Sequence, residues 1–226
     1  MPLPTRIGRL RLPVLCFLVG PSTVEGGDIE KLVRDAVDGG VTMVQLRDHD
    51  LPAGELLSVA RRLKTITRGK ALLIINDRVD VAIAVEADGV QIPEAGLPTL
   101  TTRGLIGKYA LLGRSVHNAD EAHRAGREGA EFVIAGTIYR SPTHPDAEPA
   151  GPELIREITK DSSLSVLAIG GVTADKIDEL VKAGAAGVAV ISAIAGAEDP
   201  KAAAQELITA LRDAWTNRAA AMPASA

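Results

Sequence analysis

Aromatic side chains are the scarcest feature of this sequence. Phe, Tyr and Trp make up 2% of the 226 residues, whereas 46% of all residues are hydrophobic and 24% are charged. The hydrophobic fraction is sufficient for a full core, and the charged fraction is typical of an ordinary protein surface. The core must therefore be built mostly from Ala, Val, Ile and Leu.

Other absences exclude whole classes of function. Cys16 is the only cysteine, so an internal disulfide and a thiolate metal site are excluded, and a reducing cytoplasm is expected. The net charge is −4, and no run of Lys or Arg is interleaved with aromatics, so nucleic acid is not an expected partner. No stretch approaches the roughly 20 apolar residues of a membrane span. The apolar run Val14–Val19 follows three arginines but is too short for a signal peptide, and is expected to be a buried first strand.

Short apolar runs alternate with longer amphipathic segments along the chain. The runs lack polar alternation, as is typical of strands buried on both faces. Strands are predicted at Val14–Val19, Thr42–Leu46, Leu72–Ile75, Gly89–Ile92, Leu111–Val116, Phe132–Ala135, Val166–Ile169 and Gly187–Ile191. Helices are predicted at Ile29–Asp38, Ala53–Thr67, Val79–Val85, Leu100–Lys108, Ala119–Glu128, Gly151–Thr159, Ala174–Lys182 and Lys201–Ala214.

Eight such strand–helix units predict a closed (β/α)₈ barrel, the TIM barrel of the α/β class. An open doubly wound sheet is disfavoured because Val19-Gly20-Pro21-Ser22 is a poor dinucleotide-binding loop. A single barrel domain is expected over residues 1–218, with a disordered tail over residues 219–226.

Barrel proteins commonly bind phosphate with the loops that follow strands 7 and 8. Here the seventh predicted strand runs into Gly170 and Gly171, and the eighth runs into Ile191 and Ser192. Glycine allows a close approach of backbone N–H groups, and a helix starting at Ser192 would add its positive end. These two loops predict a small phosphorylated ligand.

Polar residues also follow the other strands, where barrel enzymes place catalytic groups. His117 ends the fifth strand, and histidine is the residue type that most often serves as a general acid or base, so it is a candidate for that role. For the remaining residues, a surface ion pair or a helix cap is an equally simple explanation. They are Gln45, Arg47, Asp48, His49, Asn76, Asp77, Arg114, Ser115, Tyr139, Arg140, Ser141, Thr143 and His144.

Taken as an ordered set, these segments resemble the thiamine phosphate synthase / thiazole tautomerase superfamily. The resemblance runs from the first strand to Ala195. It is carried by Val44-Gln45-Leu46-Arg47-Asp48, Ile75-Asn76-Asp77-Arg78, Ala87-Asp88-Gly89-Val90-Gln91, Ser115-Val116-His117, Ala168-Ile169-Gly170-Gly171 and Ile191-Ser192-Ala193.

The chain departs from the synthase branch at charged positions. The resemblance implies pyrophosphate-binding lysines where this chain has His49 and His144, and a second magnesium-binding aspartate where it has Gly96. The first such aspartate matches Asp77. Displacement of pyrophosphate builds negative charge that fixed cations and Mg²⁺ must neutralise, so these losses weigh against the coupling reaction.

The leading interpretation is therefore a cofactor-free thiazole tautomerase, an isomerase of thiamine biosynthesis acting on a phosphorylated thiazole carboxylate. His117 would move the proton, while Gly170, Gly171, Ile191 and Ser192 would hold the phosphate. Substrate contacts are expected from Gln45, Arg47, Asn76, Ser115 and Thr143. The second interpretation is a thiamine phosphate synthase, a transferase that uses Mg²⁺ at Asp77 and His49 and His144 in place of lysines. The third is a non-catalytic regulatory protein that binds thiazole phosphate or thiamine phosphate. A homo-oligomer is compatible with all three.

Overall fold

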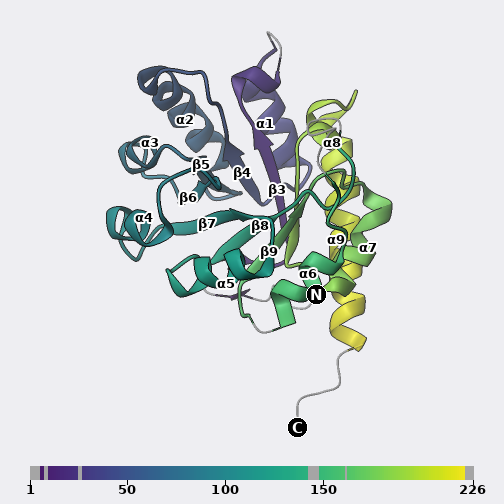
Figure 1. The fold of residues 1–226 in the computed structure, drawn as a ribbon. Helices are drawn as coiled ribbons and strands as arrows, with labels where there is room; N and C mark the ends of the chain where they lie inside the picture. Colours follow the sequence, from purple (N-terminus) through teal and green to yellow (C-terminus); the bar gives the residue numbers. More distant parts are fainter. Residues whose placement is uncertain (1–5, 8–9, 25–26, 142–147, 161, 222–226) are drawn as a thin grey trace.

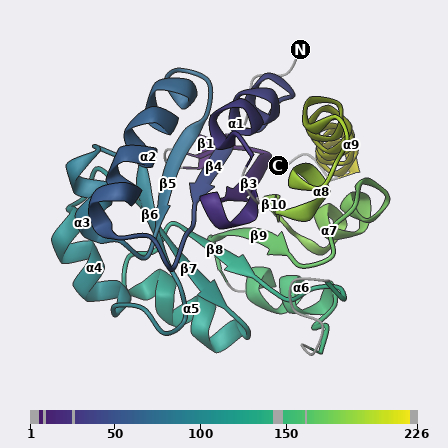
Figure 2. The ribbon, with the colours of Figure 1, turned by 90° about the horizontal axis from the view of Figure 1, so that it is seen from above.

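Eight parallel strands close into a barrel in the order β10-β3-β4-β5-β6-β7-β8-β9. The computed structural model describes residues 6–7, 10–24, 27–141, 148–160 and 162–221 (Figure 1). Helices surround the strands on the outside when the barrel is viewed from above (Figure 2). The predicted (β/α)₈ fold is confirmed. A short antiparallel hairpin of β1 and β2 precedes the barrel, and the sequence pattern did not predict it.

The barrel strands have nearly the predicted bounds, with no end shifted by more than one residue. Continuous runs of branched aliphatic residues mark such strands clearly, because both faces are buried. The strands are β1 (Arg6–Ile7), β2 (Leu10–Arg11), β3 (Val14–Val19), β4 (Met43–Leu46), β5 (Leu72–Asn76), β6 (Gly89–Ile92), β7 (Leu111–Val116), β8 (Phe132–Ala135), β9 (Ser165–Ile169) and β10 (Gly187–Val190).

The helices agree with the prediction less closely at their ends. They are α1 (Ile29–Asp38), α2 (Ala53–Thr67), α3 (Val79–Ala84), α4 (Thr99–Ile106), α5 (Ala119–Arg127), α6 (Glu153–Lys160), α7 (Ile177–Ala183), α8 (Ser192–Ala195) and α9 (Pro200–Ala221), with 3₁₀ turns η1 (Pro21–Thr23) and η2 (Ala174–Lys176). Helix α6 begins two residues late because Gly151 has a φ of 69°, outside the helical region. Helix α9 continues to Ala221, beyond the boundary expected at residue 218.

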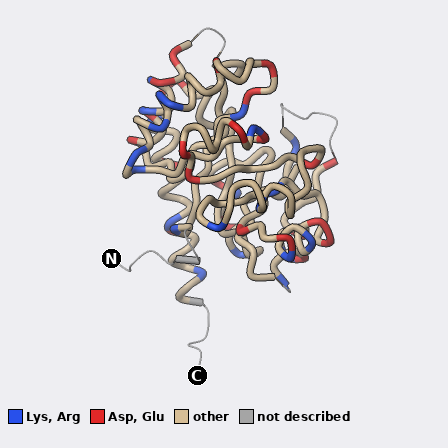
Figure 3. The backbone as a smooth tube through the Cα atoms, turned by 90° about the vertical axis from the view of Figure 1, so that its left-hand side faces the viewer, with Lys and Arg blue, Asp and Glu red and all other residues tan. Residues whose placement is uncertain are grey.

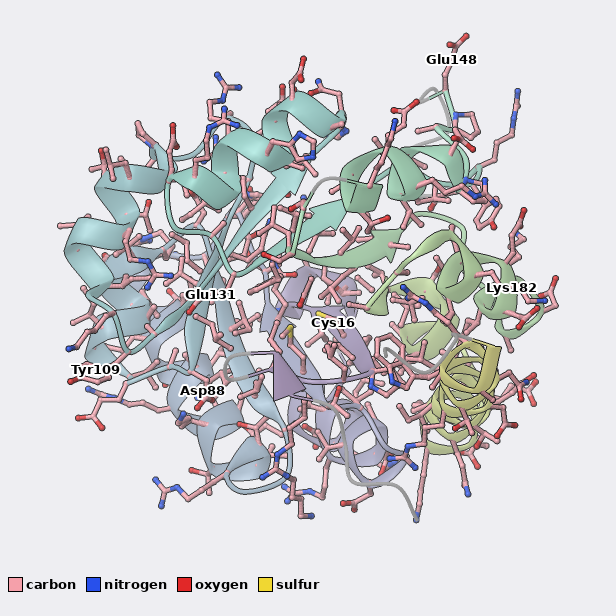
Figure 4. The ribbon with its side chains drawn as sticks, turned by 90° about the horizontal axis from the view of Figure 1, so that it is seen from below. Cys16, Asp88, Tyr109, Glu131, Glu148 and Lys182 are labelled. Atoms are coloured by element: carbon pink, nitrogen blue, oxygen red, sulfur yellow. The ribbon has the colours of Figure 1, made fainter. Side chains whose placement is uncertain are left out.

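The strands divide the core into an inner and an outer layer, because successive side chains point to opposite faces. On β3, Cys16 and Leu18 belong to the cluster inside the barrel, whereas Leu15 and Phe17 pack in the cluster between the sheet and the helices. Figure 4 shows Cys16 near the middle of the ring of strands. Burial raises the pKa of the Cys16 thiol far above its ordinary value. This cysteine is therefore a core residue and not a reactive group.

The surface carries charges of both signs. Lys and Arg are interspersed with Asp and Glu on the side shown in Figure 3. Among the described residues, none of the helices combines the length and the apolar character that a membrane crossing requires.

Candidate active site

A cavity of about 470 Å³ opens at the carboxyl ends of the barrel strands. Its size is within the usual range for small-molecule sites. Each of the eight barrel strands contributes to the cavity wall, either with its own end or with the loop that follows it. The contribution of β3 is Leu18. The polar part of the wall consists of Gln45, Arg47, Asn76, Gln91, Glu94, Ser115, His117, Thr137, Ser141, Glu148 and Ser192.

A chain of buried amides forms the floor of this cavity. The Gln45 Nε2 donates to Asn76 Oδ1 at 3.1 Å and to Gln91 Oε1 at 2.7 Å. The Gln91 Nε2 in turn donates to Ser115 Oγ at 2.7 Å. Gln45 is 1% exposed, and its Oε1 has no hydrogen-bond partner among the described residues. An unpaired buried acceptor is costly, and this oxygen is enclosed within the floor and not open to the cavity.

Arg47 and Asp48 lie beyond the end of β4, on the loop beside the cavity. The Asp48 carboxylate fastens this loop by accepting hydrogen bonds from the backbone N–H groups of Ser22, Asp50 and Leu51. Burial alone would raise the pKa of Asp48, but these three hydrogen bonds together hold it below its ordinary value. Arg47 is half-buried on the cavity wall, and its guanidinium has no hydrogen-bond or ion-pair partner within the described part of the chain. It is a fixed cation that remains available to an anionic ligand.

Two loops at the ends of β9 and β10 present backbone donors to the same cavity. Gly170 and Gly171 have φ values of 99° and 59°, which favour glycine. The backbone N–H groups of Gly170, Gly171, Val172, Ser192 and Ala193 have no hydrogen-bond partner among the residues that the structure describes. All five residues line the cavity. Unpaired backbone N–H groups on a concave wall are suited to binding an anion. We call Gly170–Val172 with Ser192–Ala193 the phosphate wall, after the ligand that the sequence predicts for these loops.

His117 lines the cavity directly after the end of β7. Its Nδ1 lies 2.6 Å from the carbonyl oxygen of Gly136, which can only accept a hydrogen bond, so Nδ1 carries a proton. Its Nε2 lies 3.4 Å from the Glu94 carboxylate. Arg114 donates to the carbonyl groups of Glu94 and Leu97 and so fastens the loop that carries Glu94. The Nε2 atom and the Glu94 carboxylate are the acid–base groups that this side offers to a ligand.

The residues present do not fit a magnesium site built from paired carboxylates. A Cβ added to Gly96 would lie 2.8 Å from Asp77 Oδ1, so the two positions are neighbours, but only Asp77 supplies a carboxylate. Asp77 is also not among the described residues that line the cavity. In the described ranges, no group of three or more His, Cys, Asp or Glu side chains is arranged to hold a metal ion. We therefore derive no chemical step through magnesium.

The structure brings most of the predicted site residues together around one cavity. Those on the cavity are Gln45, Arg47, Asn76, Ser115, His117, Gly170, Gly171, Ile191 and Ser192. His49 is exposed and does not line the cavity, while Thr143 and His144 lie outside the described residues. Sequence reasoning missed Gln91 as a site residue. The signal was present, because Gln91 is a lone amide within a strand that is otherwise apolar and buried.

The fold and the cavity define a (β/α)₈ barrel with a polar site at the carboxyl ends of its strands, the arrangement found in barrel enzymes. A family model described as thiamine monophosphate synthase matches residues 15–194, and the chain belongs to this family of enzymes of thiamine biosynthesis. The thiamine-phosphate synthase of Roseiflexus sp. (strain RS-1) is 41% identical over 192 residues, which cover 84% of this chain and 81% of that protein. The thiamine-phosphate synthase of Roseiflexus castenholzii is 43% identical over 178 residues, 78% of each chain. Among solved structures, the thiamine phosphate pyrophosphorylase from Pyrococcus furiosus matches with a TM-score of 0.81 and 34% identity, covering 89% of this chain and 96% of that one.

These relatives correct the leading interpretation from sequence. The assignment as a thiazole tautomerase, and hence as an isomerase, is wrong, because relatives about 40% identical over most of the chain are named thiamine-phosphate synthase. The assignment relied on charge losses at three positions. Position 49 is one of them, and its side chain does not reach the cavity wall, so its change from lysine to histidine carries less weight than expected. The proton-transfer role assigned to His117 is withdrawn with the tautomerase.

Proposed function

We propose that this chain is a thiamine-phosphate synthase, a transferase. It would join hydroxymethylpyrimidine pyrophosphate to thiazole phosphate. The thiazole ring nitrogen forms a bond to the methylene carbon of the pyrimidine, the bond from that carbon to the pyrophosphate oxygen breaks, and pyrophosphate leaves with the electron pair. The observation that carries this proposal is the 41% identity with a thiamine-phosphate synthase over 84% of the chain.

The phosphate wall supports the thiazole phosphate half of the proposal. Its five unpaired backbone N–H groups would donate hydrogen bonds to the phosphate oxygens of the thiazole substrate. Donors fixed in the backbone need little rearrangement when the anion arrives, so they would anchor the phosphate end of the thiazole substrate.

Arg47 and the amide floor support the pyrimidine half. Gln45, Asn76 and Gln91 line the cavity, and their amide groups would form hydrogen bonds with an aminopyrimidine ring. The Arg47 guanidinium lines the same cavity and would hold the pyrophosphate. Fixed positive charge at this position is worth most in the transition state, when negative charge grows on the leaving oxygen.

The purified protein tests this proposal directly. It is incubated with hydroxymethylpyrimidine pyrophosphate, supplied as its magnesium salt, and with thiazole phosphate. We expect thiamine phosphate and pyrophosphate to form in equal amounts. Arg47→Gln should lower kcat/KM by about 10²–10³-fold, as does the loss of one fixed donor to a developing oxyanion. Arg62→Gln is the matched control, because Arg62 pairs with Glu30 on the exposed surface of α2. Failure of the wild-type protein to form thiamine phosphate would refute the proposal.

A further inference from the structure

Lys176 lies directly behind the phosphate wall. Its Nζ donates to the carbonyl oxygen of Gly171 at 2.9 Å and lies 4.6 Å from the centre of the Tyr139 ring. Lys176 is half-buried and is not part of the cavity wall, whereas Gly171 and Val172 are. The ammonium group therefore reaches the cavity only through the backbone of Gly171.

The bond to Lys176 fixes the direction of one peptide group. The carbonyl of Gly171 and the N–H of Val172 belong to the same planar peptide and, in the trans form, point in opposite directions. When the Gly171 carbonyl is turned toward Lys176, the Val172 N–H points the other way. This N–H is one of the donors that lack a partner among the described residues.

Neighbouring contacts keep Lys176 and the loop in place. The Tyr139 N–H donates to the Gly170 carbonyl at 3.0 Å, and the Tyr139 hydroxyl donates to Glu179 Oε2 at 2.8 Å. Burial and, after it, the hydrogen bond to Glu179 raise the pKa of Tyr139, so the ring stays neutral at pH 7. A side chain at position 171 would collide with the backbone of Arg140, so the loop after β8 sits closely against Gly171.

We propose that Lys176 is a positioning residue for phosphate binding, which holds the Gly171 carbonyl away from the cavity and turns the Val172 N–H toward the bound phosphate. Its positive charge also lies behind the wall and adds to the attraction of an anion. The inference depends on the proposed function in one respect, namely that the thiazole phosphate is bound at this wall. Lys176 touches no substrate and acts through the backbone of Gly171.

The test compares binding of two ligands that differ only in the phosphate. Dissociation constants are measured by calorimetry for thiazole phosphate and for the same thiazole alcohol without phosphate. Lys176→Met keeps the aliphatic stem beside Tyr139 but removes the ammonium group. We expect it to weaken thiazole phosphate binding about tenfold, the order of one charge-assisted hydrogen bond, and to leave alcohol binding unchanged. Lys176→Arg, which keeps a charged donor, should recover most of the affinity.

Lys182→Met is the matched control, because Lys182 lies on α7 and its ammonium group pairs with Asp178 at the surface. Figure 4 shows Lys182 at the periphery of the molecule. Both ligands should bind this variant as they bind the wild type. Lys176→Gln replaces the methionine variant if the latter does not fold. Unchanged thiazole phosphate affinity, or an equal loss for both ligands, would overturn the proposal even if the Tm fell. Formation of thiamine phosphate is measured separately, so a protein that binds thiazole phosphate without turnover would refute the synthase and leave this inference standing.

Discussion

Gly96 lies beside Asp77, at the position where the family resemblance implies a second carboxylate, and a Cβ there would lie 2.8 Å from Asp77 Oδ1. Mg²⁺ demands nearly octahedral oxygen coordination and gives up its waters reluctantly, so one carboxylate is a weak ligand set. We expect titration of Mg²⁺ into the protein alone to give no saturable binding heat in calorimetry. Asp77→Asn should behave in the same way. Saturable binding by the wild type that Asp77→Asn abolishes would contradict this prediction.

Single residues of the cavity also show which features of a site can be predicted from sequence and which cannot. Gln45, Asn76 and Ser115 could be assigned to strand ends, because polar residues that interrupt apolar runs are visible in the sequence. The hydrogen bonds among them could not, since they depend on the stagger of neighbouring strands. Asn76 and Gln91 are direct partners across β5 and β6, and Gln45 reaches both from β4. Gln91 is visible in the same way, as a lone amide in an apolar strand, but its contact with Gln45 and Ser115 follows only from this stagger.

At the scale of elements, Asp48 connects two loops at the mouth of the cavity. Its Oδ1 accepts from the N–H groups of Asp50 and Leu51, and its Oδ2 accepts from Ser22 on η1. Asp48→Asn can keep the first two bonds, but its NH₂ group would face the Ser22 N–H. We expect the variant to lose about 1–2 kcal/mol of unfolding free energy at pH 7.

The pH dependence of this loss has a definite sign. The folded protein holds the pKa of Asp48 below its ordinary value, so ionised Asp48 stabilises the fold above the unfolded pKa of about 3.9. The difference in Tm between wild type and Asp48→Asn should therefore shrink as the pH falls below about 4. Asp50→Asn is the control, because that exposed residue contributes its backbone N–H and not its carboxylate. A difference that grows toward low pH would contradict the assignment.

The elements themselves could be predicted to different degrees for physical reasons. The barrel strands are continuous aliphatic runs, and their bounds follow from composition. The start of α6 depends on the conformation of Gly151, and residues Ala174–Lys176 form a 3₁₀ turn before α7. Hydrophobic periodicity predicts neither of these two features. The hairpin of β1 and β2 has only two residues in each strand, too few to show any alternation.

At the scale of the whole molecule, the sequence predicted the barrel and the family but not the branch. The prediction of the fold depends on a strand–helix pattern that is repeated eight times, so a wrong boundary in one unit has little effect on the predicted fold. The choice of branch depended mainly on the charge losses at positions 49, 96 and 144. The structure places His49 outside the cavity wall, and His144 is outside the described residues. Similarity over 84% of the chain outweighs such local differences.

Closure of the barrel joins the last strand to the first, and Gly187 lies at this seam. Gly187 of β10 is paired with Val14 of β3, and the Val14 N–H donates to the Ala186 carbonyl at 3.0 Å. A methyl group at Gly187 would collide with the Val14 carbonyl and would lie 2.8 Å from the Val14 Cβ. We expect Gly187→Ala to destabilise the protein by about 1–3 kcal/mol, the usual cost of overpacking, because the strands must separate where the ring closes.

Gly104→Ala is a matched glycine-to-alanine substitution that should have the opposite effect on the free energy of unfolding. Gly104 lies within α4, and an added Cβ would meet nothing within 4 Å. Alanine there should stabilise the protein by about 0.5–1 kcal/mol, since it reduces the freedom of the unfolded chain. Urea denaturation of both variants, followed by circular dichroism, measures the two effects on one scale. Equal stability of Gly187→Ala and Gly104→Ala would contradict this prediction. It would mean that the seam between β10 and β3 can accommodate a side chain at position 187 without loss of stability.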